Sequence, residues 1–182
     1  MCFEWNDYDN QTRGQQVRDA CASANLVFTI WLTRPFDAAS VRQACLESGA
    51  AGVSLEGEIP GYSDAAVDWQ ACVNAIADLN IHKSVVTNFA PFTTPDGLPD
   101  PAKARPLVEA GWACLTECYL PENQNLTPEA QDFYARAHLG WSETQPVLGL
   151  YEGFGHRYTL DDYPTRNQYR NWSVWDSGEV LV

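Results

Sequence analysis

The feature that most constrains the fold is an alternation of short apolar runs with stretches of helical periodicity. The runs have the length and residue types of buried strands, and their starts are nearly evenly spaced. They occupy residues 26–32, 52–58, 82–89, 113–120, 146–153 and 172–176. The stretches between them place apolar residues at three- and four-residue steps, as amphipathic helices do. The pattern predicts a parallel sheet covered by helices, either an open doubly wound sheet or a closed barrel.

Signals at the ends of the predicted helices agree with this alternation. Asp37 and Thr127 stand where an N-terminal cap is needed, before the helical periodicity begins. Gly49, Gly111 and Gly140 stand where such helices would end, and glycine is the preferred residue there. We therefore expect helix and strand to alternate along most of the chain.

Two segments repeat one pattern and favour the barrel over the open sheet. Residues 46–56 and 107–117 each read as a helix end, a glycine turn, a strand and a glutamate. An open nucleotide-binding sheet would carry a glycine-rich phosphate turn after its first strand, and neither G-x-G-x-x-G nor G-x-x-x-x-G-K-S/T occurs. The sequence therefore favours a barrel in which strands end in acids.

The length of the chain limits how complete this barrel is. The chain has 182 residues, whereas an eight-stranded barrel typically needs about 250. Counting residues 2–5 as the end of a first strand gives about seven strands. We predict an α/β fold in one domain over residues 1–182, a TIM-barrel-like βα-repeat parallel barrel that is incomplete or irregular. The proline-rich stretch 91–106 is expected to be a long loop over its mouth.

The charge balance excludes several partners. Asp and Glu number 24 against 11 Lys and Arg, for a formal charge of −13, which repels nucleic acid and anionic membrane surfaces. The longest apolar run, 26–32, is too short to cross a bilayer, and the acidic start of the chain does not resemble a secretory signal. We expect no signal peptide, no membrane insertion, and six cysteines that are buried thiols.

The candidate site residues are the polar and aromatic groups at the carboxyl ends of the predicted strands, where barrels of this kind place their chemistry. Cleavage of a glycosidic bond needs one protonated carboxyl group and one carboxylate. Glu117 is the candidate acid and Glu152 the candidate nucleophile or base. Six further residues are candidates for binding the sugar: Glu56, Glu58, Asp176, Asn88, Trp31 and Trp175. No cofactor and no metal are expected. In an alternative interpretation the acids have no catalytic role and are solvent-exposed residues around the mouth of the barrel.

Four stretches carry a resemblance to known proteins: residues 3–7, 53–58, 150–155 and 172–176. They resemble glycoside-hydrolase-like TIM barrels. Over nearly its whole length the chain is similar to the barrel domains of minor tail proteins of bacteriophages that infect actinobacteria. The resemblance implies a virion protein of the phage tail, made in the host cytoplasm, that contacts host envelope polysaccharide and serves tail assembly. Its partners would then be other tail subunits, with the chain as an oligomer or component of a complex.

The sequence departs from the motifs of the enzyme families, which counts against hydrolysis, although Glu117 and Glu152 keep a two-carboxylate mechanism open. The Asp-x-Glu pair of lysozyme-like muramidases is present only as Glu56-Gly57-Glu58, and an Asn-Glu acid of retaining enzymes is replaced by Asn88-Phe89. One alternative is an active glycosidase that uses two strand-end carboxylates on cell-wall glycan. The other is an intracellular sugar-processing enzyme.

Overall fold

The computed structural model describes most of the chain, in segments separated by short gaps. The described residues are 2–5, 8–33, 36–57, 67–88, 92–118, 127–150, 152–153, 156–157, 159–171 and 173–176. The strands are β1 (Cys2–Glu4), β2 (Thr29–Leu32), β3 (Gly52–Glu56), β4 (His82–Thr87), β5 (Ala113–Cys118), β6 (Gln145–Leu150), β7 (Glu152–Gly153), β8 (His156–Arg157) and β9 (Ser173–Asp176). The helices are α1 (Tyr8–Ser23), α2 (Ala38–Ser48), α3 (Trp69–Ala75), α4 (Pro101–Glu109), α5 (Pro128–Tyr134), the π-helix η2 (Ala135–Leu139), and the 3₁₀ helices η3 (Leu160–Asp162) and η4 (Arg166–Gln168).

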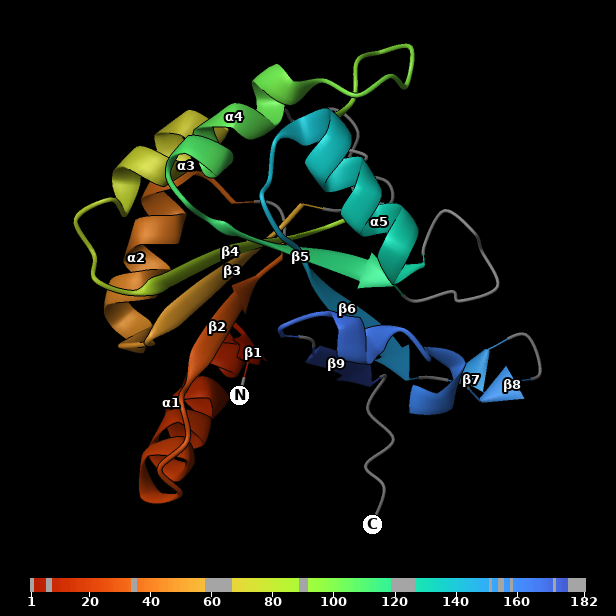
Figure 1. Ribbon diagram of the computed structural model, residues 1–182. Helices are drawn as coiled ribbons and strands as arrows, with labels where there is room; N and C mark the ends of the chain where they lie inside the picture. The colour runs from red at the N-terminus through yellow and green to blue at the C-terminus, as the bar shows by residue number, and fades with distance from the viewer. Residues whose placement is uncertain are drawn as a thin grey trace.

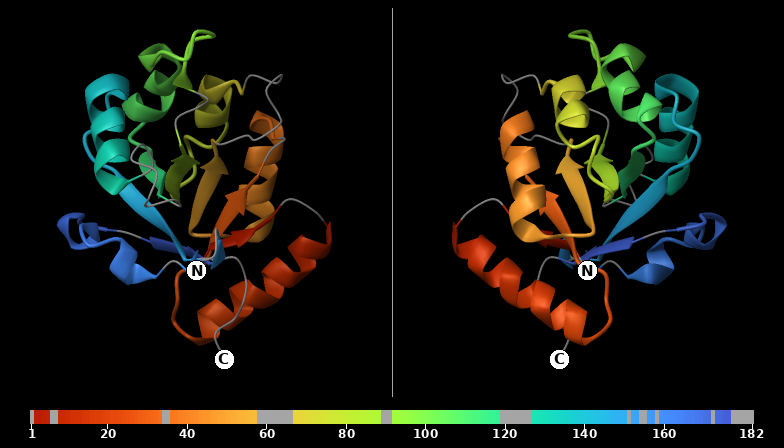
Figure 2. Two further views of the ribbon diagram at one scale, coloured as in Figure 1. Left: turned by 90° about the vertical axis from the view of Figure 1, so that its right-hand side faces the viewer. Right: turned by 90° about the vertical axis from the view of Figure 1, so that its left-hand side faces the viewer.

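Seven strands form one sheet in the order β1-β2-β3-β4-β5-β6-β9, and every neighbouring pair is parallel. The sheet is strongly twisted, with α2, α3, α4 and α5 along one side of it (Figure 1). The edge strands β1 and β9 lie on the same side of the molecule (Figures 1 and 2), and no ladder joins them within the part of the chain that is described. The predicted fold class, a βα-repeat barrel that is incomplete with about seven strands, is confirmed.

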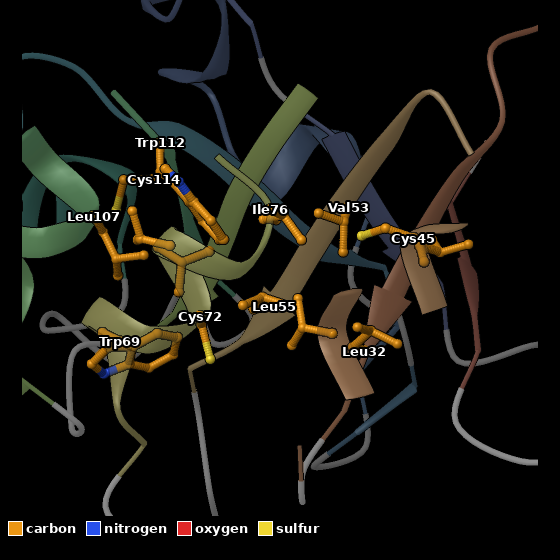
Figure 3. Close-up of a cluster of buried hydrophobic side chains, with 14 of the residues drawn as sticks. Leu32, Cys45, Val53, Leu55, Trp69, Cys72, Ile76, Leu107, Trp112 and Cys114 are labelled. Carbon is orange, nitrogen blue, oxygen red and sulfur yellow. The ribbon is translucent and has the colours of Figure 1, made fainter. Parts of the chain in front are cut away.

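The helices cover the sheet through an apolar core. Side chains alternate between the two faces of a strand, and Val53 and Leu55 of β3 lie on the face that meets the helices. They pack with Cys45 of α2, with Cys72 of α3 and with residues of α4 (Figure 3). On the other face of the sheet, the hydroxyl groups of Ser54 and Ser84 lie 2.6 Å apart and are buried. The sheet thus has an apolar outer face and a partly polar inner face.

The predicted helix ends are confirmed where the chain is described. The carboxylate of Asp37 accepts a hydrogen bond from the backbone N–H of Ser40 at 2.8 Å, and the hydroxyl of Thr127 accepts one from that of Ala130 at 3.3 Å. Gly49 ends α2 with φ of 62°, a left-handed conformation that favours glycine. These caps fix the positions at which α2 and α5 begin and α2 ends.

The prediction of one long loop over 91–106 is wrong in its second half, because α4 begins at Pro101. Asp100 caps this helix by accepting a hydrogen bond from the N–H of Ala102, and proline suits the first helical position because the N–H there has no intrahelical partner. Residues 92–100 form a compact turn in which Thr93 bridges Pro99. Phe92 is fully buried, so this turn is anchored in the core.

An aromatic chain connects this turn to two helices. Trp69 at the start of α3 packs edge-on against Phe36 and at a tilt against Phe92, with ring centroids 6.1 and 5.7 Å apart. Phe92 in turn meets Trp141, whose indole N–H donates to the carbonyl of Trp112. The four rings therefore join segments that follow β2 and β4 to α3 and to the segment before β6.

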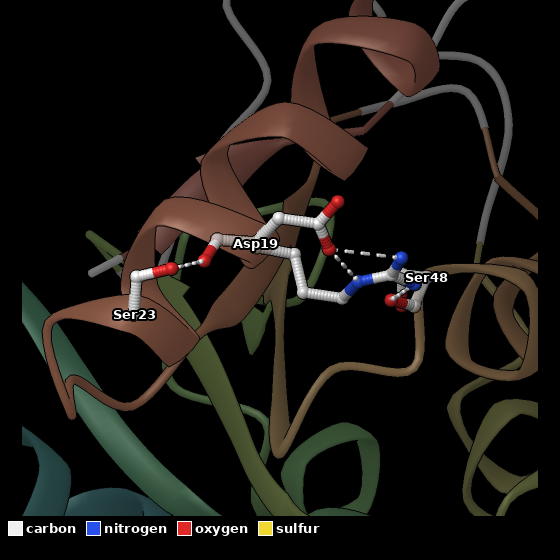
Figure 4. Close-up of polar contacts among 4 residues, drawn as sticks. Asp19, Ser23 and Ser48 are labelled. Atoms are coloured by element: carbon white, nitrogen blue, oxygen red, sulfur yellow. Dashed lines mark hydrogen bonds and ion pairs between the residues drawn. The ribbon is translucent and has the colours of Figure 1, made fainter.

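Helix α1 is polar along most of its length and lies apart from the other helices, beside β1 and β2 (Figures 1 and 2). Its Arg18 donates from Nη1 to the carbonyl of Ser48 at the end of α2, at 3.2 Å. Arg18 also pairs with the neighbouring Asp19, and the hydroxyl of Ser23 donates to the Asp19 carbonyl (Figure 4). A cation at the carboxyl end of a helix is favourable, so Arg18 both caps α2 and attaches α1 to it.

The interior holds five free cysteines: Cys21, Cys45, Cys72, Cys114 and Cys118. This agrees with the prediction of buried thiols, and the side chain of Cys2 lies outside the description. Burial raises the pKa of Cys45 to about 11 and that of Cys118 to about 12, and it raises the pKa of Cys114 as well. The thiolate forms of these three are therefore strongly disfavoured at neutral pH.

An ion pair between α2 and the turn after α3 predicts a pH-dependent stability. Arg42 donates from Nη1 and Nη2 to the two carboxylate oxygens of Asp78, at 2.6 and 3.0 Å. These hydrogen bonds lower the pKa of Asp78 from its ordinary value of 3.8. Because the folded-state pKa is depressed, the contribution is present above about pH 4 and is lost as the pH falls through the folded value. We expect unfolding midpoints of the wild type and Asp78→Asn to differ at neutral pH and to converge in acid.

Urea unfolding followed across this pH range tests that expectation. The effect is small because both side chains are partly exposed, and salt is expected to reduce it further. Asp96→Asn, in the exposed turn before α4, is a matched control, and its unfolding midpoint should follow that of the wild type at every pH. A difference between wild type and Asp78→Asn that stays constant down to strong acid would contradict the assignment.

Candidate functional site

Two buried glutamates lie near the carboxyl ends of two strands of the sheet. Glu56 is the last residue of β3 and is 8% exposed, and Glu117 is the next-to-last residue of β5 and is 4% exposed. Charged side chains are seldom buried unless the site has a use for them or a partner for them. Burial of two carboxyl groups at the same end of one sheet therefore identifies the candidate site.

The register places both glutamates on the inner face of the sheet. Leu55 and Cys114 pack in the core with the helices, so Glu56 and Glu117, which lie an odd number of residues away in their strands, face the other side. Glu56 pairs with Val86 of β4, and Val86 pairs with Leu115, two residues before Glu117. Glu117 is thus two strands away from Glu56 and one inward-facing position further along. The sequence predicted this common end of the sheet for both residues.

Asn88 lies between the two glutamates, after the intervening strand β4, and Trp31 lies on β2, on the other side of Glu56. The β4–β5 ladder ends with Thr87 opposite Thr116, so the half-buried Asn88 follows at the level of Glu117. Trp31 pairs with Ser54, one inward-facing position before Glu56. The indole nitrogen of Trp31 is buried and has no hydrogen-bond acceptor among the described residues. An indole N–H is a donor only, so it is available to an oxygen atom of a ligand.

Gly57 holds the end of β3 against β4. Its backbone N–H donates to the carbonyl of Val86 at 2.6 Å. A Cβ atom at Gly57 would lie 2.9 Å from that same oxygen and 3.0 Å from the Cβ of Thr87. Only glycine permits this approach, which fixes the backbone directly after Glu56. Sequence reasoning noted Gly57 only within the Glu-Gly-Glu run and assigned it no such function.

The expected position of Glu152 needs a correction. The sequence predicted one strand over 146–153, but β6 ends at Leu150 and Glu152 begins β7, which pairs antiparallel with β8. Glu152 is therefore in a small hairpin after the strand and outside the seven-stranded sheet. The hairpin forms because Gly153 pairs with His156 and Glu152 with Arg157. The side chain of Glu152 lies outside the description, so its role as nucleophile or base stays a prediction.

The remaining predicted site residues are placed only by their backbone or not at all. Asp176 ends β9 opposite Leu150, and Trp175 pairs with Gly149, which puts both at the carboxyl end of the sheet. Their side chains, and the whole of Glu58, lie outside the described residues. The described part of the site consists of Glu56, Glu117, Asn88 and Trp31.

This arrangement has the groups that acid–base chemistry on a sugar needs. Two carboxyl groups supply one proton donor and one base, and the amide and indole groups supply hydrogen bonds to hydroxyl groups. Within the described segments, no three His, Cys, Asp or Glu side chains are grouped as ligands of a metal ion. No helix in these segments is long and apolar enough to cross a membrane.

Comparison with known proteins identifies the fold. No protein-family model matches the chain, and no curated protein matches it. Among solved structures, orotidine 5'-phosphate decarboxylase from Thermotoga maritima matches with a TM-score of 0.53 and 12% identity, over 100% of this chain and 81% of that one. Orotidine 5'-monophosphate decarboxylase from Methanocaldococcus jannaschii, complexed with the inhibitor BMP, matches with a TM-score of 0.53 and 11% identity. That match covers 92% of this chain and 71% of the other.

A third solved structure has a different chemistry. Oxaloacetate acetylhydrolase in complex with 3,3-difluorooxalacetate matches with a TM-score of 0.52 and 13% identity, over 90% of this chain and 59% of that one. Identities this low show the fold alone, because one barrel fold serves many unrelated reactions. The three structures confirm the TIM-barrel type of architecture and leave the activity to be argued from the site.

Proposed function

We propose that this chain is a glycoside-hydrolase-like barrel domain of a phage tail, and that it binds host envelope polysaccharide at the carboxyl end of its sheet. The observation that supports a binding site there is the pair of buried glutamates, Glu56 and Glu117. Both lie on the inner face of the sheet, on β3 and β5, which are separated by β4. The tail setting and the tail-assembly partners come from the resemblance of the sequence to minor tail proteins.

The charge at the strand ends favours an uncharged ligand. The last residues of the seven sheet strands are Glu4, Leu32, Glu56, Thr87, Cys118, Leu150 and Asp176, and none of these is Lys or Arg. A phosphate or carboxylate ligand would meet acids there, and the chain as a whole carries −13. A polyhydroxyl ligand instead offers donors to the carboxylates and acceptors to Trp31 and Asn88. The phosphate and dicarboxylate ligands named for the solved structures above are therefore not transferred to this chain.

A binding experiment tests the proposal directly. Soluble polysaccharide prepared from actinobacterial envelopes is titrated into the wild type, Glu56→Gln and Glu117→Gln. Loss of a hydrogen bond from a hydroxyl group to a buried carboxylate is expected to weaken binding about tenfold for each variant. Glu47→Gln and Glu109→Gln, both exposed on helices, are charge-matched controls that should bind like the wild type.

Contrary outcomes are well defined. Equal binding by Glu56→Gln, Glu117→Gln and the wild type would remove the strand-end site. If the folded wild type does not bind the polysaccharide, the proposed binding function is contradicted. If the chain is never found in assembled tails, the proposed tail setting is contradicted.

Glycosidase activity is a second candidate, favoured by the presence of two carboxyl groups at one end of the sheet. Reducing-sugar release from the same polysaccharide distinguishes it from binding alone. If the chain cleaves glycan, Glu117→Gln is expected to lower the rate by at least about a hundredfold, because it removes a general acid. Glu152→Gln tests the second carboxylate in the same assay, and a full rate for that variant would exclude Glu152 as nucleophile or base.

A further inference from the structure

A cavity of about 330 Å³ lies in the outer wall of the barrel, away from the strand-end glutamates. It is formed by α5 and η2, by residues 143–145 leading into β6, and by residues 168–171 leading into β9. These last two segments precede their strands, so the cavity is near the amino ends of β6 and β9, whereas Glu117 is near the carboxyl end of β5. Cavities of this size accept small organic ligands.

The wall is irregular at this point. Between the other neighbouring strands of the sheet the chain forms a helix, but between β6 and β9 the described residues form a hairpin and two 3₁₀ helices. Leu160 and Tyr163 of this connection pack on Cys118 and Leu148, so they cover part of the outer face. Residues 168–171 of the same connection line the cavity. Helix α5 continues as a π-helix from Ala135, a rare form that often occurs at functional sites, and Arg136 of this π-helix also lines the cavity.

Charges of both signs line the cavity in equal number. Asp132 and Glu143 supply two carboxylates, and Arg136 and Arg170 supply two guanidinium groups. Asp132 accepts hydrogen bonds from Arg136 at 3.3 Å and from the hydroxyl of Thr144 at 2.9 Å. An anion or a cation would meet a group of its own sign as well as an opposite one. The balance of charge therefore favours a neutral polar ligand.

Neutral donors and acceptors complete the lining. Gln168 and Asn171 each present an amide, which donates and accepts. Burial raises the pKa of Tyr169, and the negative charges of Glu129 and Asp132 raise it further, so its phenol keeps its proton. Planar carboxylate, guanidinium and amide groups match the paired hydroxyl groups of a sugar ring, because each can make two parallel hydrogen bonds.

We propose that this cavity is a second carbohydrate-binding site, which holds one sugar unit of a polysaccharide without help from Glu56 or Glu117. The proposal rests on the proposed function in the choice of polysaccharide as the ligand. With one site at the carboxyl end of the sheet and one in its wall, a single chain would contact a glycan at two points. Two weak contacts on one polymer increase the overall affinity because the second binding step is intramolecular.

The test is a titration of isotope-labelled protein with soluble oligosaccharides of glucose, galactose, arabinose and N-acetylglucosamine, followed by backbone amide chemical shifts. Inorganic phosphate and glutamate are titrated separately as charged probes. We expect a sugar to shift the amides of 132–136, 143–145 and 168–171. Arg170→Ala and Gln168→Ala should weaken this response about tenfold.

Matched variants separate this site from the first one. Arg105→Ala on α4 and Gln70→Ala on α3 remove the same side chains from exposed positions outside the cavity and should leave the response unchanged. Because Arg170 and Gln168 are exposed, their replacement is compatible with folding, which the amide spectrum itself verifies. Glu117→Gln should also leave the response at the cavity unchanged.

Other results of the titration would contradict the second site, the strand-end site, or both. A response confined to residues 54–57, 86–88 and 115–118 overturns the second site and leaves the proposed function standing. A response of the cavity to phosphate or glutamate but to no sugar replaces the carbohydrate with an ionic ligand and overturns the proposal. A response of the cavity alone supports the second site and removes the strand-end site, and no response anywhere overturns both.

Discussion

Trp69→Ala is expected to lower the free energy of unfolding by about 4 kcal/mol, which is a large share of the 5–15 kcal/mol typical of a domain. Trp69 is 6% exposed and contacts the rings of Phe36 and Phe92. Its removal leaves a cavity at the start of α3, removes two aromatic contacts and exposes the buried Phe92 turn to water. Urea unfolding followed by far-ultraviolet circular dichroism measures the loss.

Two further variants calibrate that result. Trp69→Phe keeps an aromatic ring and is expected to cost less than half as much. Phe133→Ala removes a ring that is 65% exposed, so its stability should stay within about 0.5 kcal/mol of the wild type. If Trp69→Ala were as stable as Phe133→Ala, the aromatic chain would not hold the turn and the helices together.

Gly57→Ala is expected to lower stability by about 2 kcal/mol and to weaken polysaccharide binding together with it. The added methyl group would lie 2.9 Å from the carbonyl oxygen of Val86, and the backbone atom it meets cannot rotate away. The ends of β3 and β4 must separate, which breaks the Gly57 hydrogen bond and displaces the adjacent Glu56. Thermal unfolding and the polysaccharide titration measure the two effects on one protein sample.

Gly52→Ala is the matched control for this substitution. A methyl group at Gly52 would lie 3.1 Å from side-chain carbons of His82 and Thr29 and 3.2 Å from the backbone oxygen of His82, which is a looser approach than the 2.9 Å at Gly57. Gly52 lies at the other end of the same strand. A smaller loss of stability and normal binding are expected there. Equal effects of the two substitutions would mean that β3 tolerates no side chain at either end, and that Gly57 has no special relation to the site.

The strands and the glutamates near their carboxyl ends could be predicted from the sequence because each strand is a short apolar run that leads to an acid. The repeated helix end, glycine turn, strand and glutamate in 46–56 and 107–117 placed Glu56 and Glu117 at corresponding positions, as the structure has them. Helix α1 lacked such a signal, because its residues are polar on nearly every side and its attachment depends on Arg18. Its docking is a tertiary effect that local patterns do not encode.

Prolines explain the main error in the fold, and strand length explains the error in the site. The density of proline in 91–106 suggested a loop, although Asp100 followed by Pro101 is a typical helix start. The apolar run 146–153 suggested a strand that reached Glu152, but antiparallel pairing of 152–153 with 156–157 competes with continuation of β6. The cavity beside α5 was not foreseen, because its residues come from three separate segments with no common pattern.

The buried cysteines make local opening of the interior measurable by chemical labelling. A reagent that alkylates cysteine reacts with thiolate, so Cys45, Cys114 and Cys118 are shielded both by their surroundings and by their raised pKa. Labelling of each one therefore requires that its neighbourhood separate and admit water. Cys21 in α1, Cys72 in α3 and Cys118 in β5 lie in three different elements, so their labelling rates would rank how readily each element opens.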